Sequence, residues 1–480
     1  FDFMLSNPPY GKSWASEQKY IKDGKDVIDS RFIVNLADYW GNKSDVDATP
    51  RSSDGQLLFL MEMVGKMKPS SSNGIGSRIA SVHNGSSLFT GDAGGGESNI
   101  RRYIIENDLL DAIIQLPNNL FYNTGITTYI WLLSNNKAQN RKGKVQLIDA
   151  NDLYSKLRKN LGDKNCELEP KHIAKIMEVY SKFETYDDEI DGKKISSKIF
   201  DNSDFGYYKV QIERPKRLKA QFRDDLIETL KYDKTLEEAM IWCEQEYKEE
   251  CYNDLTKYKK AIEEHLDKND IELNTKQLKS LLSKELWKKH KMLVDTAKLL
   301  KEKIGTTTYD DFNIFKEKVE KILKEHKLSL SASEKNMILN AVSWYDETAQ
   351  KVIKKISKIS GDKLEKLCEN FGCEENELCD FGYYPTGKKD EFVEYESDTD
   401  LRDSENIPLK DDIYQYFLKE VKPHVQEAWI NLDSTKIGYE ISFNKYFYTH
   451  KPLRSLEEVG KDIVELENAS DGLIKEILGL

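Results

Sequence analysis

The sequence predicts an α/β protein: an incomplete, doubly wound sheet in the first third, a largely helical region after it, and an α+β C-terminal region that ends in a helix. Three observations lead to this prediction. The first 160 residues alternate short apolar runs with segments of helical periodicity. Lys and Glu then dominate from residue 215 to 370, with apolar residues at helical spacing. The remaining residues combine acidic, turn-rich sequence with short apolar runs.

The first third carries the clearest pattern of secondary structure. Apolar runs rich in β-branched and aromatic residues predict strands at 2–6, 78–82, 110–116, 126–133 and 144–150. Apolar residues every three or four positions predict helices over 54–67 and 97–107. Strands that alternate with helices favour a parallel sheet. Because 110–116 and 126–133 lie close together, they are also compatible with an antiparallel pair at the sheet edge.

These patterns divide the chain into four segments. Residues 1–160 hold the sheet, 161–214 form a connecting segment, 215–370 form a helical arm, and 371–480 form a C-terminal domain. The tail carries apolar residues at heptad-like spacing, followed by two more: Leu456, Val459, Ile463, Leu466, Leu473 and Ile477. This pattern predicts either a helix that docks on a partner or one that packs on its own domain.

Charge limits the classes of partner. The 480-residue chain has 72 Lys and Arg against 84 Asp and Glu, a net charge of −12, with +2 in residues 1–160 and −14 in the rest. A large basic surface for nucleic acid is therefore excluded over most of the chain. DNA, if it binds, must meet the first third or the cations of another subunit. No apolar run is long enough to cross a membrane.

Six cysteines are spread over the long chain, and the last three are spaced C-x4-C-x5-C without a neighbouring His. This spacing is poor for zinc, so we expect no metal site. Reduced thiols in a cytoplasmic protein are the favoured interpretation. The chain also opens inside an apolar run at Phe1, which we interpret as a piece of a longer protein.

The tetrapeptide Asn7-Pro8-Pro9-Tyr10 directly follows the first predicted strand, which places it where open α/β sheets bind ligands. The Asn7 side-chain oxygen and the Pro8 carbonyl could each accept one N–H of an exocyclic amino group and aim its lone pair. The prolines stiffen the loop, and Tyr10 offers a flat face to a base taken out of its stack. An ordinary loop turn is the alternative interpretation.

Asn-Pro-Pro-Tyr resembles the hallmark of S-adenosylmethionine-dependent amino-group methyltransferases, which act on adenine N6 in DNA or on a glutamine amide of release factors. Other segments resemble the modification (M) subunit of type I restriction–modification systems: 51–60, 78–107, 116–134, 144–165 and, more loosely, 406–425 and 436–448. The resemblance implies the C-terminal half of a Rossmann-like methyltransferase sheet. The helical middle has no specific match.

The resemblance also implies roles for individual residues. Asn7, Pro8, Pro9 and Tyr10 match the catalytic loop, with Asn7 next to the cofactor and Tyr10 against the target base. Phe121 matches an aromatic residue that helps to hold the flipped base, although a core position is at least as good an interpretation. Such subunits transfer a methyl group from S-adenosylmethionine to adenine N6 in DNA. They assemble with a specificity subunit and a restriction subunit.

One departure from the family pattern concerns the cofactor. These enzymes carry an Asp/Glu-x-Phe-x-Gly-x-Gly motif on a strand upstream of the tetrapeptide, and the sequence contains no such motif before or after it. We therefore expect the chain to hold the target-base half of the site, with the remaining cofactor residues upstream. Alone, it should bind S-adenosylmethionine weakly or not at all. The strand at 2–6 should then have an open, apolar edge.

Other features have open interpretations. Gly94-Gly95-Gly96 predicts a flexible loop that touches DNA or a partner, or else a plain connector. We expect the side chains of Arg101 and Arg102 either to lie on a solvated helix face or to contact phosphates. The segment 12–50 mixes basic and aromatic residues and predicts a DNA contact or a mobile surface loop. We expect His83 to be structural, because no nucleophile pairs with it.

Two rival functions remain at this point. The tetrapeptide also permits methylation of a protein glutamine amide or of an RNA amino group, although the downstream segments favour DNA. The chain could instead act as a non-catalytic assembly scaffold.

Overall fold

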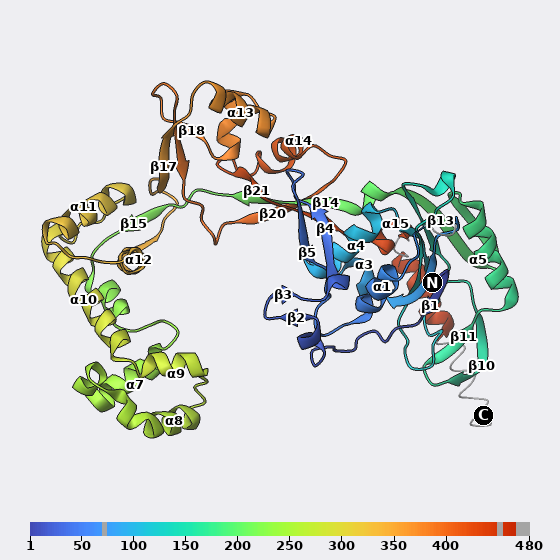
Figure 1. The fold of residues 1–480 in the computed structure, drawn as a ribbon, viewed down its shortest axis with the longest axis horizontal. Helices are drawn as coiled ribbons and strands as arrows, with labels where there is room; N and C mark the ends of the chain where they lie inside the picture. The colour runs from blue at the N-terminus through green and yellow to red at the C-terminus, as the bar shows by residue number, and fades with distance from the viewer. Residues whose placement is uncertain (70–73, 449–454, 467–480) are drawn as a thin grey trace. The chain divides into compact units, whose positions relative to one another are not determined.

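The computed structural model describes residues 1–69, 74–448 and 455–466. The chain divides into two compact units (Figure 1). Unit 1 contains Phe1–Tyr208, Pro408–Lys410 and Lys436–Leu480, and unit 2 contains Lys209–Ile407 and Asp411–Thr435. Among the residues that the structure describes, none of the helices combines the length and the apolarity that a membrane span requires.

Unit 1 is built on a seven-stranded mixed sheet. In spatial order its strands are β1 (Phe3–Ser6), β6 (Arg78–Asn84), β8 (Thr128–Ser134), β7 (Leu110–Gln115), β9 (Lys144–Asp149), β13 (Lys193–Asp201) and β12 (Tyr186–Ile190). The pairs β1–β6 and β7–β9 are parallel, and the other neighbours are antiparallel. The strands β1, β6, β7 and β9 therefore run in one direction and end at the same side of the sheet, called here the carboxyl edge.

The position of β8 differs from the prediction. We expected the strands at 110–116 and 126–133 to form an antiparallel pair at the sheet edge. The antiparallel pairing is confirmed, but the edge position is wrong, because β8 lies between β6 and β7. This strand has hydrogen-bonded neighbours on both sides and is buried along most of its length, in keeping with its apolar sequence. The predicted parallel sheet is consequently a mixed one.

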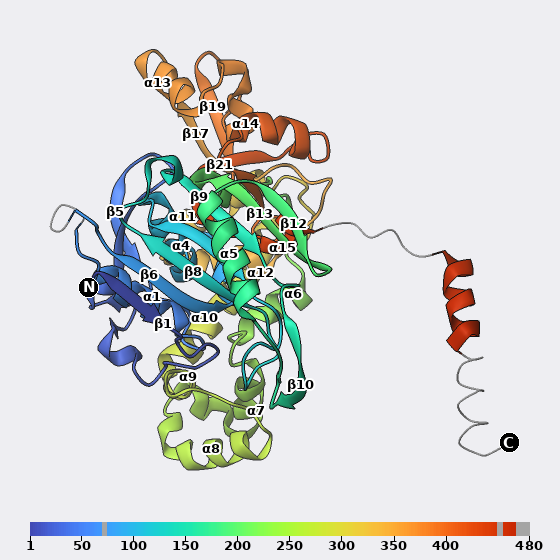
Figure 2. The ribbon, with the colours of Figure 1, turned by 90° about the vertical axis from the view of Figure 1, so that its right-hand side faces the viewer.

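Helices cover both faces of this sheet. One face is covered by α1 (Gln56–Gly65), α3 (Ser86–Phe89) and α4 (Gly96–Glu106), which bury Leu60, Ile104 and Trp131 in the largest apolar cluster of the unit. On the opposite face, α5 (Pro170–Lys182) packs over β7, β9 and β13 through Ile176 and Val179 (Figure 2). The helices predicted over 54–67 and 97–107 correspond to α1 and α4, and they form because each presents one apolar stripe to the sheet.

The edge strand β1 is open on one side. Phe3 and Leu5 point to the same face and are 70% and 86% exposed, whereas Met4 packs against the core on the opposite face. In the described chain, no strand pairs with the outer edge of β1. The open, apolar edge that we expected at residues 2–6 is therefore confirmed.

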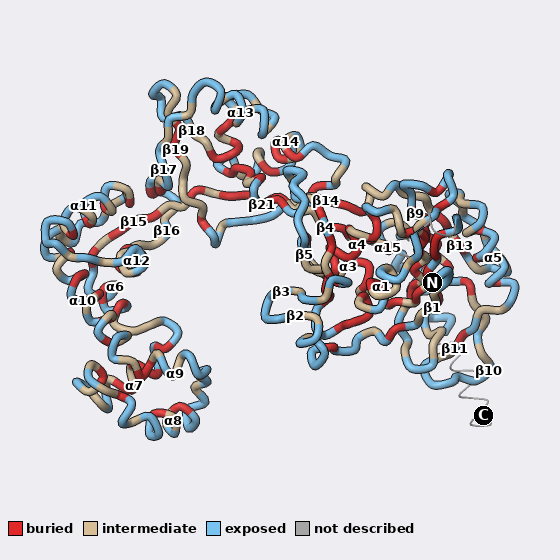
Figure 3. The backbone as a smooth tube through the Cα atoms, viewed as in Figure 1, coloured by how far each residue is buried: buried red, intermediate tan, exposed pale blue. Residues whose placement is uncertain are grey.

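Three hairpins lie outside the main sheet: β2 (Lys22–Asp23) with β3 (Asp26–Val27), β4 (Ile33–Ala37) with β5 (Lys43–Asp47), and β10 (Ser155–Leu161) with β11 (Lys164–Glu167). Figure 3 shows β2–β3 and β10–β11 as mainly exposed chain. Residues 161–214, for which we predicted a connecting segment, contain α5, β12 and β13, and the two strands extend the sheet. The four-part division of the chain stays a prediction.

Unit 2 is mainly helical, as the periodicity of residues 215–370 predicted. Its helices are α6 (Asp224–Glu228), α7 (Glu237–Tyr247), α8 (Lys259–Lys268), α9 (Thr275–Leu281), α10 (Lys284–Ile304), α11 (Phe312–Glu325), α12 (Ala332–Ala341), α13 (Asp362–Phe371) and α14 (Ile413–Tyr416). Its short strands are β15 (Leu218–Ala220), β16 (Ser343–Tyr345), β17 (Ile353–Lys358), β18 (Tyr384–Pro385) and β19 (Glu391–Tyr395). Two separate apolar clusters form, one around α10–α12 and one around α7–α9.

A further three-stranded sheet has the order β20 (Asp403–Pro408), β14 (Gly206–Glu213) and β21 (Trp429–Tyr439), and α15 (Phe443–Phe447) follows. Residues 456–466 are helical, as predicted, and their heptad-spaced apolar side chains are exposed: Leu456, Val459, Ile463 and Leu466. The predicted continuation at Leu473 and Ile477 lies outside the described residues.

Candidate active site

The tetrapeptide Asn7–Tyr10 leaves β1 at the carboxyl edge of the sheet, as the sequence predicted. Pro8 is buried and fixes the loop against the protein, while Asn7 and Pro9 are exposed. Within the described chain, the Asn7 side chain makes no hydrogen bond. Its amide oxygen is therefore available to a ligand, which is the state that the proposed grip on an amino group requires.

Tyr10 is half-buried at the end of the tetrapeptide. Its partial burial raises the pKa of the phenol above its ordinary value, so the hydroxyl is neutral over the physiological pH range. A ring that is only half covered still has surface to offer to a planar ligand. The structure therefore leaves room for the predicted stacking role.

The loop is tied to the start of α1 immediately after Tyr10. The Gly11 amide donates to Asp54 Oδ1 at 3.1 Å, and the Lys12 carbonyl accepts from the Gly55 amide at 3.1 Å. Gly11 has a φ of +67°, a conformation that glycine adopts without strain. The end of the tetrapeptide is thus held by two hydrogen bonds to residues that precede a buried helix.

Asp54 belongs to a compact polar network that joins α1 to the carboxyl end of β6. Gln56 Nε2 donates to Asp54 Oδ2 at 2.7 Å, to Asn84 Oδ1 at 2.7 Å and to the Ser86 hydroxyl at 2.9 Å. The Ser86 hydroxyl in turn donates to Asp54 Oδ2 at 3.0 Å. Because most of these groups are buried, their mutual bonds rigidify the support below the tetrapeptide. The sequence reasoning did not single out Asp54, Gln56 or Asn84, since only the fold brings them together.

His83 lies inside this network and is fully buried. Its Nδ1 atom is 3.2 Å from Gln56 Oε1, and burial lowers its pKa to about 3. The ring is therefore neutral at physiological pH and adds to the packing below the site. This environment agrees with the structural role that we expected.

A cavity of about 380 Å³ opens beside the tetrapeptide. Its lining includes Pro9, Trp14, Phe32 and Phe59, with two carboxylates, Glu17 and Glu62. Trp14 is buried, and its indole N–H donates to the Arg51 carbonyl at 2.9 Å, so this wall is fixed. The cavity therefore adjoins the tetrapeptide at Pro9 and has aromatic walls that suit a planar group, while Asn7, Pro8 and Tyr10 are not among its lining residues.

Phe121 lies in the loop between β7 and β8, also at the carboxyl edge. The sheet order puts two strands between β1 and β7, which corresponds to about 14 Å at the usual strand spacing. The half-buried Phe121 packs against the apolar cluster under α5. The next residue, Tyr122, is 59% exposed and is the aromatic side chain of this loop that solvent reaches most. The sequence reasoning passed over Tyr122, although it adjoins Phe121 in a polar loop.

The two arginines of α4 differ from both of their interpretations. Arg101 is fully buried and donates to the Tyr439 carbonyl at 2.6 Å and to the Ser87 carbonyl at 3.1 Å. Arg102 is also buried, with Glu106 and the Ala37 carbonyl as partners. Neither arginine lies on a solvated helix face, and neither guanidinium is free for phosphate.

Gly96 starts α4 in close contact with another segment. A Cβ atom at Gly96 would lie 1.7 Å from the Thr49 carbonyl oxygen, and Glu97 accepts from the Arg51 amide at 2.8 Å. The glycine-rich stretch therefore lets the chain around Thr49 approach the helix, and the interpretation as a loop that touches DNA or a partner stays a prediction. The close approach of Thr49 leaves no room at this helix start to cradle a phosphate.

The segment 12–50 is folded rather than mobile. It contains the β2–β3 and β4–β5 hairpins, and two of its cations are already paired: Lys22 with Asp47, and Arg31 with both Asp29 and Glu62. Its capacity to neutralise DNA phosphates is correspondingly reduced.

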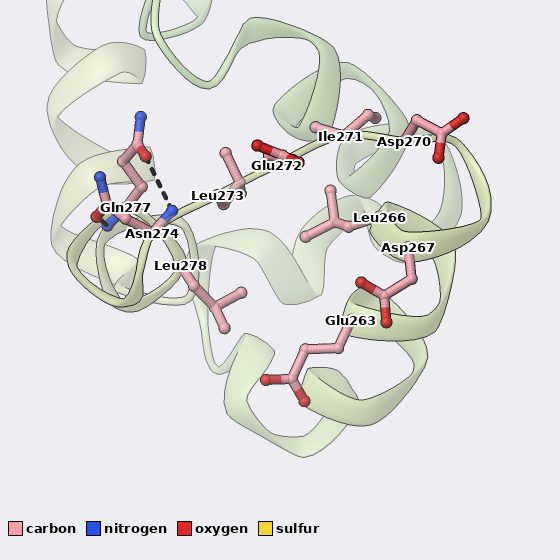
Figure 4. A pocket seen from close by; sticks show the side chains of 10 residues that line it. All are labelled: Glu263, Leu266, Asp267, Asp270, Ile271, Glu272, Leu273, Asn274, Gln277 and Leu278. Atoms are coloured by element: carbon pink, nitrogen blue, oxygen red, sulfur yellow. Dashed lines mark hydrogen bonds between the residues drawn. The ribbon is translucent and has the colours of Figure 1, made fainter. Parts of the chain in front are cut away.

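A cavity of about 940 Å³ lies in unit 2 near α8 and α9 (Figure 4). Four carboxylates line it, from Glu263, Asp267, Asp270 and Glu272. These negative charges would repel a nucleic acid. Across the described residues, no cluster of three or more metal-ligating side chains occurs.

Comparison with known proteins identifies the first part of the chain. Residues 1–215 match the N-6 DNA Methylase family model. The match covers a little under half of the chain. The predicted resemblance to the methylase subunits of type I restriction enzymes is confirmed by the curated relatives.

Two of these relatives show how much of the protein is shared. The chain is 29% identical over 191 residues to the MjaIX methylase subunit of Methanocaldococcus jannaschii, which covers 39% of this chain and 29% of the relative. It is 29% identical over 181 residues to the MpnII methylase subunit of Mycoplasma pneumoniae, which covers 38% and 28%. The match therefore spans less than a third of these relatives' length.

A solved structure with a similar fold is the type I restriction–modification methyltransferase subunit from Streptococcus thermophilus. It shares 24% identity and a TM-score of 0.31, and covers 42% of this chain and 34% of that subunit.

Proposed function

We propose that this chain carries the target-base part of an S-adenosylmethionine-dependent adenine-N6 DNA methyltransferase, as a portion of the modification subunit of a type I restriction–modification system. The observation that carries this proposal is the unbonded Asn7 amide on a proline-stiffened loop at the carboxyl end of β1. The match of residues 1–215 to the N-6 DNA Methylase family model supports the reaction class.

In the proposed mechanism the tetrapeptide acts by positioning. Asn7 Oδ1 and the Pro8 carbonyl accept the two N–H groups of the adenine amine, which localises the lone pair on the nitrogen and directs it away from the loop. Tyr10 stacks on the extruded base. Because the loop is held by Gly11 and the network around Asp54, little reorganisation precedes the reaction.

S-adenosylmethionine, when bound, supplies a sulfonium methyl group that is already electrophilic, so no charged general base is required of this chain. Of the described residues, Asn7 fits the cofactor side because its amide is exposed and unbonded. The start of α4 does not fit a glycine-rich cofactor cradle, because Thr49 fills the space at Gly96. The free edge of β1 is where we place the cofactor-binding strand that the family resemblance implies.

We propose DNA, a specificity subunit and a restriction subunit as partners. The first third, with its net charge of +2, would meet DNA. The exposed apolar side chains of residues 456–466 would dock on a partner subunit.

The decisive experiment uses the full-length protein, assembled with its partners, and methyl-labelled S-adenosylmethionine. An adenine-containing duplex, an RNA and a glutamine peptide are offered in parallel. The proposal requires transfer to the duplex and its loss when the target adenine is replaced by an analogue without the amino group. Transfer to the peptide or the RNA would support the rival methyltransferases, and no transfer in any arm would support an assembly scaffold.

A further inference from the structure

The β10–β11 hairpin stands at the carboxyl edge of the sheet, directly after β9 (Figure 2). The tetrapeptide after β1 and the Phe121 loop after β7 lie at this same edge, because the three strands run in one direction. The hairpin is therefore on the side of the sheet where the proposed chemistry takes place. No role has so far been attached to it.

The hairpin carries an excess of unpaired positive charge. Residues 155–167 contain four cations and two acids, a net charge of +2, in a chain whose total is −12. Lys156, Arg158 and Lys159 are exposed, and none has an acidic partner among the described residues. Lys156 and Arg158 flank the half-buried Leu157, and both are exposed. By contrast, Lys22 and Arg31 in the segment 12–50 are neutralised by carboxylates.

The hairpin is also fastened to the loop that carries Phe121 and Tyr122. The Asp163 amide donates to the Tyr122 carbonyl at 2.9 Å, and the Asn165 amide donates to the Asn119 carbonyl at 3.1 Å. Asn119 Nδ2 returns a bond to the Asp163 carbonyl at 2.9 Å. Two backbone bonds from the hairpin and one side-chain bond from the loop therefore hold the two segments together.

Lys164 and Gly162 tighten the same junction. Lys164 Nζ donates to the Leu120 carbonyl at 3.0 Å and lies 5.7 Å from the centre of the Tyr122 ring. Gly162 has a φ of +65°, and a Cβ atom there would lie 2.5 Å from the Tyr122 carbonyl oxygen. Only glycine permits this close approach, so the backbone that carries Tyr122 and the hairpin that carries the cations of β10 are held next to each other.

We propose that the β10–β11 hairpin is a DNA-backbone contact of this protein, with Lys156 and Arg158 on phosphates beside the target base and Tyr122 facing the nucleic acid between them and the Asn7 loop. Free cations next to an exposed aromatic ring form the pattern that binds a nucleic-acid strand around an unstacked base. The hydrogen bonds between the hairpin and the Phe121 loop would hold that loop in a fixed position relative to the bound DNA backbone. This inference rests on the proposed function.

The test compares two charge-matched double variants of the full-length protein, assembled with its partners. One is Lys156→Gln with Arg158→Gln. The control is Lys142→Gln with Lys144→Gln, which removes two exposed cations at the start of β9, at the opposite edge of the sheet. Binding of a labelled duplex is measured over a range of salt concentrations. Loss of two phosphate contacts should make the slope of log affinity against log salt shallower by about two.

The control pair should keep the wild-type slope, and Lys156→Arg with Arg158→Lys should restore it, because charge and not shape is required. If the hairpin and control variants give the same slope, the inference is overturned, even when the wild-type protein methylates the duplex. If the hairpin governs the slope but the wild-type protein methylates nothing, the proposed function fails and the contact stands.

Discussion

Replacing Asp54 by Ala should slow methyl transfer without touching any group that meets the substrate. Asp54 is 6% exposed and accepts from the Gly11 amide, the Gln56 amide, Gln56 Nε2 and the Ser86 hydroxyl. Removing this acceptor leaves buried donors unsatisfied, which costs about 1–3 kcal/mol of folding free energy. It also frees Gly11, and a displacement of the reacting groups by about 1 Å costs about 100-fold in rate. We therefore expect a drop of about 10- to 100-fold in the single-turnover rate.

Asp111 provides the matched control, because it is also 6% exposed and pairs with Arg141 and Tyr180 at the start of β7, away from the carboxyl edge. Asp111→Ala should cost at least as much stability, because it leaves the buried Arg141 guanidinium without its carboxylate, yet it should keep the rate. Both variants of the full-length protein are assayed at a temperature where circular dichroism shows them folded. Equal rates for Asp54→Ala and Asp111→Ala would refute the positioning role of Asp54.

Two predictions concern stability. Burial lowers the pKa of His83 from 6.5 to about 3. Below pH 6.5, His83 is protonated in the unfolded chain but stays neutral in the folded chain, so the free energy of unfolding falls as the pH falls. By pH 5 the loss of unfolding free energy reaches about 2 kcal/mol. Urea unfolding at pH 7 and pH 5 should therefore show a loss of unfolding free energy that is smaller in His83→Gln than in the wild type by this amount. An equal loss in the two proteins would contradict this prediction. Gly96→Ala should destabilise by about 1–3 kcal/mol, because its Cβ would meet the Thr49 carbonyl, whereas Gly65→Ala, with open space around it, should not destabilise. A thermal shift of the same size in both glycine variants would contradict the steric argument.

Local sequence pattern predicted five strands of the main sheet and two of its covering helices, but not the order of the strands in the sheet. The helix predicted over 54–67 is α1, and the strand predicted over 78–82 is β6, because apolar periodicity directly reports the buried face. The short connection between β7 and β8 correctly indicated an antiparallel pair. The insertion of β8 between β6 and β7 depends on pairing between distant segments, which no local pattern contains.

The candidate site shows the same limit. Asn7 could be placed because its motif directly follows a strand, and that placement needs no distant contact. Arg101 was misread because its guanidinium is buried and donates to the Tyr439 carbonyl, which is 338 positions away in the sequence. The Asp54–Gln56–Asn84 network was missed for the same reason, since α1 and β6 meet only in the fold.

The central claim is that the Asn7 amide grips the amino group that receives the methyl. The most direct measurement is the single-turnover methylation rate of Asn7→Ala in the assembled full-length protein, with duplex and S-adenosylmethionine saturating and DNA binding measured alongside. Loss of one preorganised polar group at the reacting centre should lower the rate by about 100- to 1,000-fold while the duplex remains bound. A rate within about twofold of the wild-type value would contradict the account, since twofold is far below the cost of losing such a group.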